Sequence, residues 1–194
     1  MRSSSTTEDR VTAVALGLFG SQGYAVTSME QVRGEADVSN GSLYHLFPSK
    51  AALAARLYCR GMIQCQDGVL DALQAASDAE EGVRGGVAFQ AAWVDRHVEL
   101  ARLVYADWPD DVLVAAAPSL DGPSRNYVRV VDRWLRHHVA AGALIDRPFP
   151  VLHALWLGPT QEFCRQWLRG RSRLRPRHVA AHLADGAWRA LAAS

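Results

Sequence analysis

A single stretch of 24 residues, Thr27 to Lys50, constrains this chain more than any other part of its sequence. It contains two short segments with apolar residues at helical spacing, separated by a turn. Thr27 and Glu30 stand in the positions of an N-cap and its reciprocal partner, and Ser39 is placed to cap the second segment. Pro48 ends that segment because proline cannot continue a helix. Two short helices joined by a tight turn predict a helix-turn-helix.

This stretch resembles the helix-turn-helix of the TetR/AcrR family of transcriptional repressors. The resemblance rests on residues 27–32, 38–47 and 49–50, which match the family's usual residue types in order and spacing. It implies an all-α fold of about nine helices. In that fold, residues 1–50 form a three-helix DNA-binding domain, and residues 51–194 form a helical bundle for effector binding and dimerisation.

Two residues depart from the family pattern. Arg33 stands where a small alanine usually lets the two helices cross closely, so the crossing angle need not be that of the family. Asp37 stands where glycine usually makes the turn, although Asp tolerates the left-handed conformation better than most residues. The alternative to a DNA-binding element is a helical hairpin that does not bind DNA.

Candidate DNA contacts follow from the second helix of the motif. Residues at the start of a recognition helix enter the major groove, and the base-proximal set is therefore Ser39, Asn40, Gly41 and Ser42. The Asn40 amide can bond to adenine N6 and N7, or else contact only backbone or water. The family resemblance assigns phosphate contacts to Thr27, Ser28, Tyr44, His45 and Lys50. For Tyr44 the alternative is a place in the core.

The rest of the chain also shows helical periodicity, and alternating strand patterns are nearly absent. Its 49% hydrophobic and 21% charged residues are ordinary for a soluble globular protein. Helices are predicted over residues 8–22, 49–77, 87–96, 97–106, 112–117, 124–141 and 149–169, and from 176 onward. Residues 78–86 and 119–123 are predicted to be connections because they contain glycine or proline. The Gly158-Pro159 pair is expected to kink its helix.

Residues beyond position 85 are rich in aromatic side chains, and helical proteins often bind small molecules in aromatic-lined cavities. A hydrophobic or aromatic effector is therefore predicted, although each of these side chains has core packing as its alternative. The candidate ligand-binding residues are Met62, Cys65, Phe89, Trp93, His97, Tyr105, Trp108, Tyr127, Trp134, His138, Trp156, Gln161 and Phe163.

Dimerisation is implied by the family resemblance, which assigns it to the last two helices. An apolar stripe at helical spacing supplies candidate interface residues. They are Leu152, Val179, Leu183, Ala187 and Leu191. The alternative is that this stripe packs within its own subunit.

Charge, cysteine content and motifs exclude several classes of function. The net charge is +1, and residues 1–50 hold four basic and five acidic side chains, so DNA affinity must come from a few placed donors and from dimerisation. Three cysteines without CxxC spacing predict buried thiols, with a redox sensor as the alternative, and no metal site. Neither a secretory signal nor an apolar run long enough to span a membrane is present, so we expect a cytoplasmic protein. No common catalytic or cofactor motif occurs, and neither an enzyme nor a cofactor is predicted.

The sequence thus predicts a ligand-responsive repressor that binds a palindromic operator in double-stranded DNA as a homodimer. A small effector would release it from the operator. The rival hypothesis is a helical small-molecule-binding or sequestering protein without operator binding. The net negative charge of residues 1–50 and the presence of Arg33 favour this rival.

Overall fold

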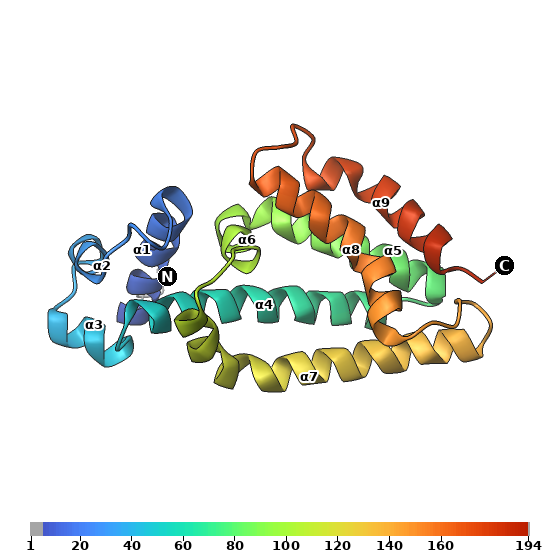
Figure 1. The fold of residues 1–194 in the computed structure, drawn as a ribbon, viewed down its shortest axis with the longest axis horizontal. Coiled ribbons are helices and arrows are strands. Elements are labelled where there is room, and N and C mark those ends of the chain that lie inside the picture. The colour runs from blue at the N-terminus through green and yellow to red at the C-terminus, as the bar shows by residue number, and fades with distance from the viewer. Residues whose placement is uncertain (1–5, 194) are drawn as a thin grey trace, which may run out of the picture. The chain divides into compact units, whose positions relative to one another are not determined.

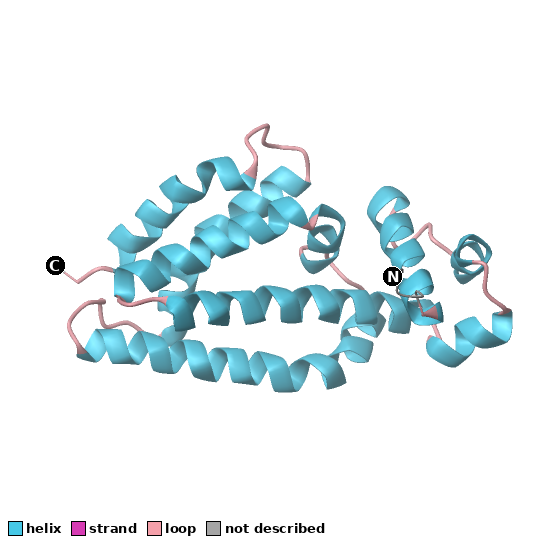
Figure 2. Cartoon of the chain, turned by 180° about the vertical axis from the view of Figure 1, so that it is seen from behind, coloured by secondary structure: helices cyan, strands magenta, loops and turns pink. Residues whose placement is uncertain are grey.

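The computed structural model describes residues 6–193, and within them the regular structure is helical (Figures 1 and 2). The described helices are α1 (Thr7–Gln22), α2 (Met29–Ala36), α3 (Asn40–Leu46), α4 (Lys50–Ala75), α5 (Ala79–Arg96), α6 (Val98–Val104), α7 (Asp110–Ala140), α8 (Phe149–Leu168) and α9 (Pro176–Leu191). The predicted all-α architecture is confirmed. No helix in residues 6–193 is long and apolar enough to cross a membrane.

The chain forms two compact units. The first contains the residues up to Met62 together with Glu99–Asp121, and the second contains Ile63–Val98 and the residues from Gly122 onward. Both α4 and α7 therefore contribute one part to each unit. The first unit is larger than the predicted domain of residues 1–50, because it also includes the start of α4, most of α6 and the start of α7.

The core of the first unit is built from the apolar faces of α1, α2, α3 and α4. Val11, Ala15 and Phe19 of α1 are buried, because they recur at helical spacing. Leu43 of α3 is fully buried among them. Thr6 and Asp9 form a capping box that fixes where α1 begins.

The start of α2 corrects one prediction. Ser28, and not Thr27, is the N-cap: its hydroxyl accepts from Gln31 N–H at 3.1 Å, and the Gln31 side chain accepts from Ser28 N–H at 2.9 Å. The Thr27 hydroxyl instead donates to Gly23 C=O at 2.8 Å, and the residue is buried. A capping box one residue later therefore replaces the predicted Thr27–Glu30 pair.

The turn after α2 is made by Asp37 in the left-handed conformation, with φ 50° and ψ 59°. Asp37 N–H donates to Gly34 C=O and Val38 N–H donates to Arg33 C=O, both at 3.3 Å. This pair of bonds is a Schellman motif, and it satisfies carbonyl groups that would otherwise be left unpaired at the helix end. The expectation that Asp37 accepts a left-handed turn is confirmed.

Asp37→Gly is expected to raise the free energy of unfolding by about 0.5–1 kcal/mol. Glycine adopts positive φ without steric cost, and the change also removes a negative charge from the negative end of a helix dipole. Urea denaturation of the two proteins at neutral pH measures the difference. A variant less stable than the parent would mean that the carboxylate makes a compensating interaction.

The beginning of α5 corrects a second prediction, because residues 79–86 are helical and not a connection. Asp78 caps the helix by accepting from Glu81 N–H at 2.8 Å. The glycines that suggested a loop are instead sites of close packing: a Cβ on Gly82 would lie 2.2 Å from the Trp134 ring, and one on Gly86 would lie 2.3 Å from the Trp156 ring. Glycine is needed in this helix for space and not for flexibility.

The long α7 corrects a third prediction, since the expected break at residues 119–123 is absent. Pro118 and Pro123 lie inside one continuous helix. Each proline removes one helical hydrogen bond, from the carbonyl groups of Val114 and Ser119, and both of those residues are exposed to solvent. Water can therefore satisfy the unpaired carbonyls. The predicted helix from Phe149 and the predicted start at Pro176 are confirmed.

The core of the second unit lies among α5, α7, α8 and α9. Helix α5 packs against both α8 and α9, and α8 packs against α9. Trp156 and Leu152 of α8 are fully buried, as is Leu191 of α9. The arrangement leaves the opposite faces of α8 and α9 exposed, and this exposure bears on assembly below.

Candidate nucleic-acid interface

Helix α3 presents a polar face to solvent. Leu43 and Phe47 anchor the helix in the core of the first unit, with 0% and 5% of their surface exposed. The side chains that remain exposed belong to Asn40, Ser42, Tyr44 and His45, and Gly41 lies among them. These are five of the nine predicted DNA-contacting residues. Tyr44 is 45% exposed, so it is not a core residue.

The N-terminus of α3 is fixed by two serines. Ser39 Oγ accepts from Ser42 N–H at 3.1 Å and lies 2.9 Å from Ser42 Oγ. The two hydroxyls are therefore hydrogen-bonded to each other. Asn40 lies between the two serines in the sequence, and its side chain is exposed. Gly41 adds no side chain, and a Cβ there would meet only Ser39 Oγ, at 4.0 Å. A ligand can thus approach the backbone of the first turn closely.

The three remaining residues that were predicted to contact phosphate differ in their exposure to solvent. Ser28 is exposed at the start of α2 and caps it. Thr27 is 1% exposed, with its hydroxyl donated to a main-chain carbonyl. Lys50 is half-buried at the start of α4, and its ammonium group points at main-chain carbonyls of residues 24–27. The structure therefore brings Ser28 to the surface and holds Thr27 beneath it.

A family comparison identifies this module. The model of the family described as "Bacterial regulatory proteins, tetR family" matches residues 11–57, which include α1, α2, α3 and the start of α4. The N-terminal part of this chain is therefore similar to the DNA-binding region of TetR-family proteins. No curated protein sequence matches the chain.

Solved structures extend the likeness to the fold of the whole chain. A TetR-family transcription regulator from Marinobacter aquaeolei VT8 is 19% identical, with 97% of this chain and 96% of that chain covered and a TM-score of 0.72. The fatty acid degradation regulator FadR from Bacillus halodurans is 16% identical, with 96% and 97% covered and a TM-score of 0.79. FadR from Bacillus subtilis, solved with stearoyl-CoA, is 14% identical, with 93% and 97% covered and a TM-score of 0.78. The chain has the fold of a TetR-family transcription regulator.

Arg33, one of the two departures from the TetR pattern, points away from the helix crossing. Its guanidinium pairs with Glu30 at 2.5 Å, one turn back on the same helix. The buried residues of α2 are Val32 and Ala36. The longer side chain is therefore accommodated at the surface of α2. The pair lowers the pKa of Glu30 through a hydrogen bond and the charge of Arg33.

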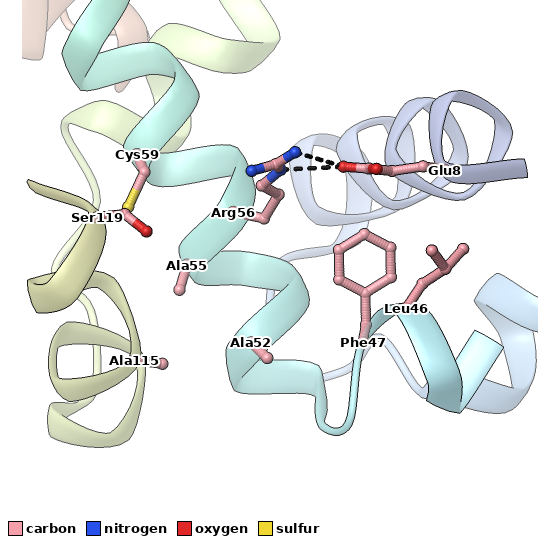
Figure 3. Close-up of a pocket in the computed structure, with 9 residues that line it drawn as sticks. All are labelled: Glu8, Leu46, Phe47, Ala52, Ala55, Arg56, Cys59, Ala115 and Ser119. Atoms are coloured by element: carbon pink, nitrogen blue, oxygen red, sulfur yellow. Dashed lines mark hydrogen bonds and ion pairs between the residues drawn. The ribbon is translucent and has the colours of Figure 1, made fainter. Parts of the chain in front are cut away.

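A cavity of about 340 Å³ lies in the first unit behind the end of α3 (Figure 3). Leu46 and Phe47 form one side of it, and Arg56 of α4 reaches across to Glu8 of α1 at 2.6 Å. Cys59 lies at the side nearest α7 and donates to Ala116 C=O at 3.6 Å. The Arg56–Glu8 pair joins α4 to the start of α1.

All three cysteines are buried, as predicted. Burial raises the pKa of Cys65 to about 12 and that of Cys164 to about 12, and it also raises the pKa of Cys59. A thiol with a raised pKa is protonated at neutral pH and is a poor nucleophile. The geometry therefore favours a packing role for these residues over redox sensing.

The predicted effector residues do not form one group. Met62, Tyr105 and Trp108 belong to the first unit. Trp108 packs edge-on against Tyr24, with ring centroids 5.4 Å apart, and its Nε1 donates to Leu103 C=O at 2.8 Å. The other ten belong to the second unit, where His97 is exposed and the rest are buried or half-buried.

Several of these aromatic residues pack against glycines. Trp156 lies over Gly86 and donates from Nε1 to Val83 C=O at 2.8 Å. Trp134 lies over Gly82, and Phe89 lies over Gly68. Trp134 and Trp156 are also stacked, with ring centroids 6.3 Å apart. In this conformation the large aromatic side chains fill space between helices.

A group of buried polar residues lies among α4, α7 and α8 in the second unit. Tyr127 OH and His153 Nε2 are 3.1 Å apart, and Cys65 is within electrostatic range of both Tyr127 and Cys164. Burial lowers the pKa of His153, so its ring is neutral at pH 7, and burial raises the pKa of Tyr127. His153 was not predicted from the sequence, because a single histidine in an apolar helix carries no motif.

Two buried oxygen atoms of the second unit lack a hydrogen-bond partner among the described residues. They are Gln66 Oε1 on α4 and Thr160 Oγ1 on α8. Gln66 Nε2 donates to Ser124 of α7 at 3.3 Å, while Thr160 is fully buried. An unpaired buried polar atom is costly, and a bound molecule or water would relieve that cost.

Three of the five predicted dimer-interface residues are buried in the core of their own subunit. Leu152, Ala187 and Leu191 are 0–2% exposed, and Val179 and Leu183 are half-buried. The exposed large apolar residues of α8 are instead Val151 and Leu155, at 43% and 36%. The stripe predicted for dimerisation and the exposed apolar residues thus lie on different faces of these helices.

Proposed function

We propose that this protein is a homodimeric repressor that binds a palindromic operator through α3 and is released by a small effector. The observation that carries the proposal is the exposed face of α3, where Asn40, Gly41 and Ser42 open the helix and Tyr44 and His45 follow one turn later. The face belongs to a TetR-family module. A DNA-binding role places the protein in the cytoplasm.

The chemistry of this face suits base contacts at the first turn and phosphate contacts beside it. Asn40 carries both a donor and an acceptor, the pair that matches the N6 and N7 edge of adenine. Gly41 permits close approach, and the N–H groups at the start of α2 and α3 favour phosphate oxygens. Ser28, Tyr44 and His45 are exposed where they would flank such a contact.

The dimer supplies the second half-site. We place the two-fold interface on the exposed faces of α8 and α9, because they carry apolar and small residues that the subunit does not use. On α8 these are Val151, Ala154, Leu155 and Pro159, and on α9 they are Ala181, Gly186 and Ala190. Small residues allow helices of two subunits to approach closely, and a two-fold dimer matches a palindrome with half-sites about one helical turn apart.

The effector site belongs in the second unit, at the pair formed by Tyr127 and His153. Thr160, two turns further along α8 from His153, adds a buried hydroxyl. The polar atoms of the site are uncharged, and the Phe149 and Trp156 rings lie next to His153, so it suits a largely hydrophobic molecule with one or two hydrogen-bonding groups. A structural relative, FadR from Bacillus subtilis, was solved with stearoyl-CoA, which supports a hydrophobic ligand class. Binding would shift the population toward a state with lower operator affinity, by a coupling of about 1–3 kcal/mol.

The test is selection of binding sites from random duplex DNA by the purified full-length protein at moderate salt. The proposal predicts enrichment of a palindrome. Asn40→Ala should then weaken binding to the enriched site by about 1–3 kcal/mol, and replacing one adenine of the half-site should cost the variant less than the parent. A folded dimer that enriches no sequence would instead support the rival hypothesis of a small-molecule-binding protein without operator binding.

A further inference from the structure

We propose that Lys50 is a positioning residue. It holds residues 24–27 against the start of α4 and so sets the placement of α2 for DNA binding, and it does not itself bind a phosphate. This inference rests on the proposed operator binding. It also replaces the phosphate contact that the family resemblance assigned to this residue.

The contacts of Lys50 account for the whole of its hydrogen-bonding capacity. Its Nζ lies 2.9 Å from Tyr24 C=O, 3.3 Å from Ala25 C=O and 2.9 Å from Thr27 C=O. An ammonium group has three N–H bonds and no acceptor, so three carbonyl partners satisfy it. The same Nζ lies 4.4 Å from the centre of the Tyr24 ring, within the range of a cation–π contact. A phosphate would have to displace one of these partners.

The position of Lys50 in its helix favours these contacts. It is the first residue of α4, where the helix dipole is positive and disfavours a cation. Three carbonyl oxygens converging on the ammonium offset that cost. The ammonium also satisfies carbonyl groups of a segment that lies outside any helix. Two of the three hydrogen bonds are partly buried. Lys50 is also the only lysine in the chain, since every other basic residue is arginine or histidine.

The held segment leads directly to the N-cap of α2. Thr27 Oγ1 donates to Gly23 C=O at 2.8 Å and accepts from Gln22 Nε2 at 3.2 Å. Gln22 Nε2 also lies 3.3 Å from Gln31 Oε1, the atom that accepts from Ser28 N–H. A shift of the segment would therefore be passed on to Ser28 and to the first turn of α2.

The other end of the segment contacts the connection between α6 and α7. The Tyr24 ring packs against Phe19, with ring centroids 5.6 Å apart, and against Trp108. Trp108 also packs against Tyr58 of α4, at 6.2 Å. Lys50 thus fixes a junction, inside the first unit, between the segment that follows α6 and the start of α2.

The test compares Lys50→Met with the parent and with two controls. Methionine keeps an unbranched apolar stem of similar length and removes the ammonium. Arg56→Met is the matched control, because it removes one positive charge from the same helix without touching residues 24–27. Lys50→Arg is the rescue variant, since it restores donors and charge. Operator affinity is measured over a series of salt concentrations, well below each variant's melting temperature. Amide hydrogen exchange of residues 24–29 is measured without DNA.

Lys50→Met is expected to weaken operator binding about tenfold, as loss of hydrogen bonds to a charged group would. The slope of log affinity against log salt should stay unchanged, and exchange at residues 24–29 should become faster. Arg56→Met should leave that exchange unchanged, and Lys50→Arg should restore part of the protection. A slope reduced by about 0.9, with unchanged exchange, would assign a phosphate contact to Lys50 and overturn the inference. If the parent binds no specific DNA, the proposed function fails, and the exchange measurement still decides whether Lys50 holds the segment.

Discussion

Leu155→Glu is expected to convert the proposed dimer into a monomer and to abolish operator binding at nanomolar protein concentration. Leu155 is 36% exposed on α8, one turn from Val151, on a face that the subunit leaves uncovered. A two-fold axis presents every substitution twice. Loss of an apolar anchor of about 2 kcal/mol from each subunit corresponds to roughly a thousandfold rise in the dimer dissociation constant. The new carboxylates also repel each other if they lie near the axis.

Sedimentation equilibrium measures the dimerisation directly, and operator binding at fixed protein concentration measures its consequence. Val128→Glu on α7 is the control, because Val128 is 44% exposed but lies outside the α8 and α9 faces. The control should remain dimeric and should bind the operator. A Leu155→Glu protein that is still dimeric at micromolar concentration would show that the subunits meet elsewhere.

Gly86→Ala is expected to lower the free energy of unfolding by about 2 kcal/mol. Inside a helix this substitution normally stabilises by about 0.5–1 kcal/mol. Here a Cβ would lie 2.3 Å from Cζ2 and 3.0 Å from Cε2 of Trp156. That ring is fully buried and its Nε1 is bonded to Val83 C=O, so it cannot move aside without loss. Overpacking of this kind typically costs about 1–3 kcal/mol.

The adjacent residue provides a matched control for that experiment. Gly85 lies in the same helix, and a Cβ there would meet only ordinary van der Waals contacts, with Ala72 Cβ at 3.7 Å. Gly85→Ala should therefore stabilise the protein by about 0.5–1 kcal/mol. Chemical denaturation of both variants measures the two changes in the free energy of unfolding, which are expected to have opposite signs. Equal effects at the two positions would mean that the Trp156 ring yields without cost.

The elements that sequence analysis predicted best are those with local signals. Pro48 and Ser39 mark the limits of α3, and Pro176 marks the start of α9. The errors arose where one residue type is compatible with two different structural roles. The glycines of α5 suggested flexibility, but they make room for Trp134 and Trp156, whose positions depend on long-range packing.

The candidate site was predictable in outline but not in its contacts. Helix spacing placed Asn40, Tyr44 and His45 on one surface, and these side chains are exposed. The partners of Lys50 lie more than 20 residues earlier in the chain, and no local pattern records them. In the same way, the apolar stripe through Leu183 and Ala187 indicated a buried face without indicating which helix covers it.

Exchanging DNA-binding specificity between relatives would require more than one crossover in this chain. Residues 103–120 contribute Leu103, Val112 and Ala116 to the core that also holds α1 and α3, and each of the three is at least 96% buried. A recombinant joined only at residue 50 would therefore combine one parent's recognition helices with the other parent's packing surface. Three joints, one in α4 and one on each side of residues 99–121 where the chain returns, would keep that core intact. The operator preference of such a recombinant would thus depend on residues 103–120 as well, although they lie far along the sequence from the predicted DNA contacts.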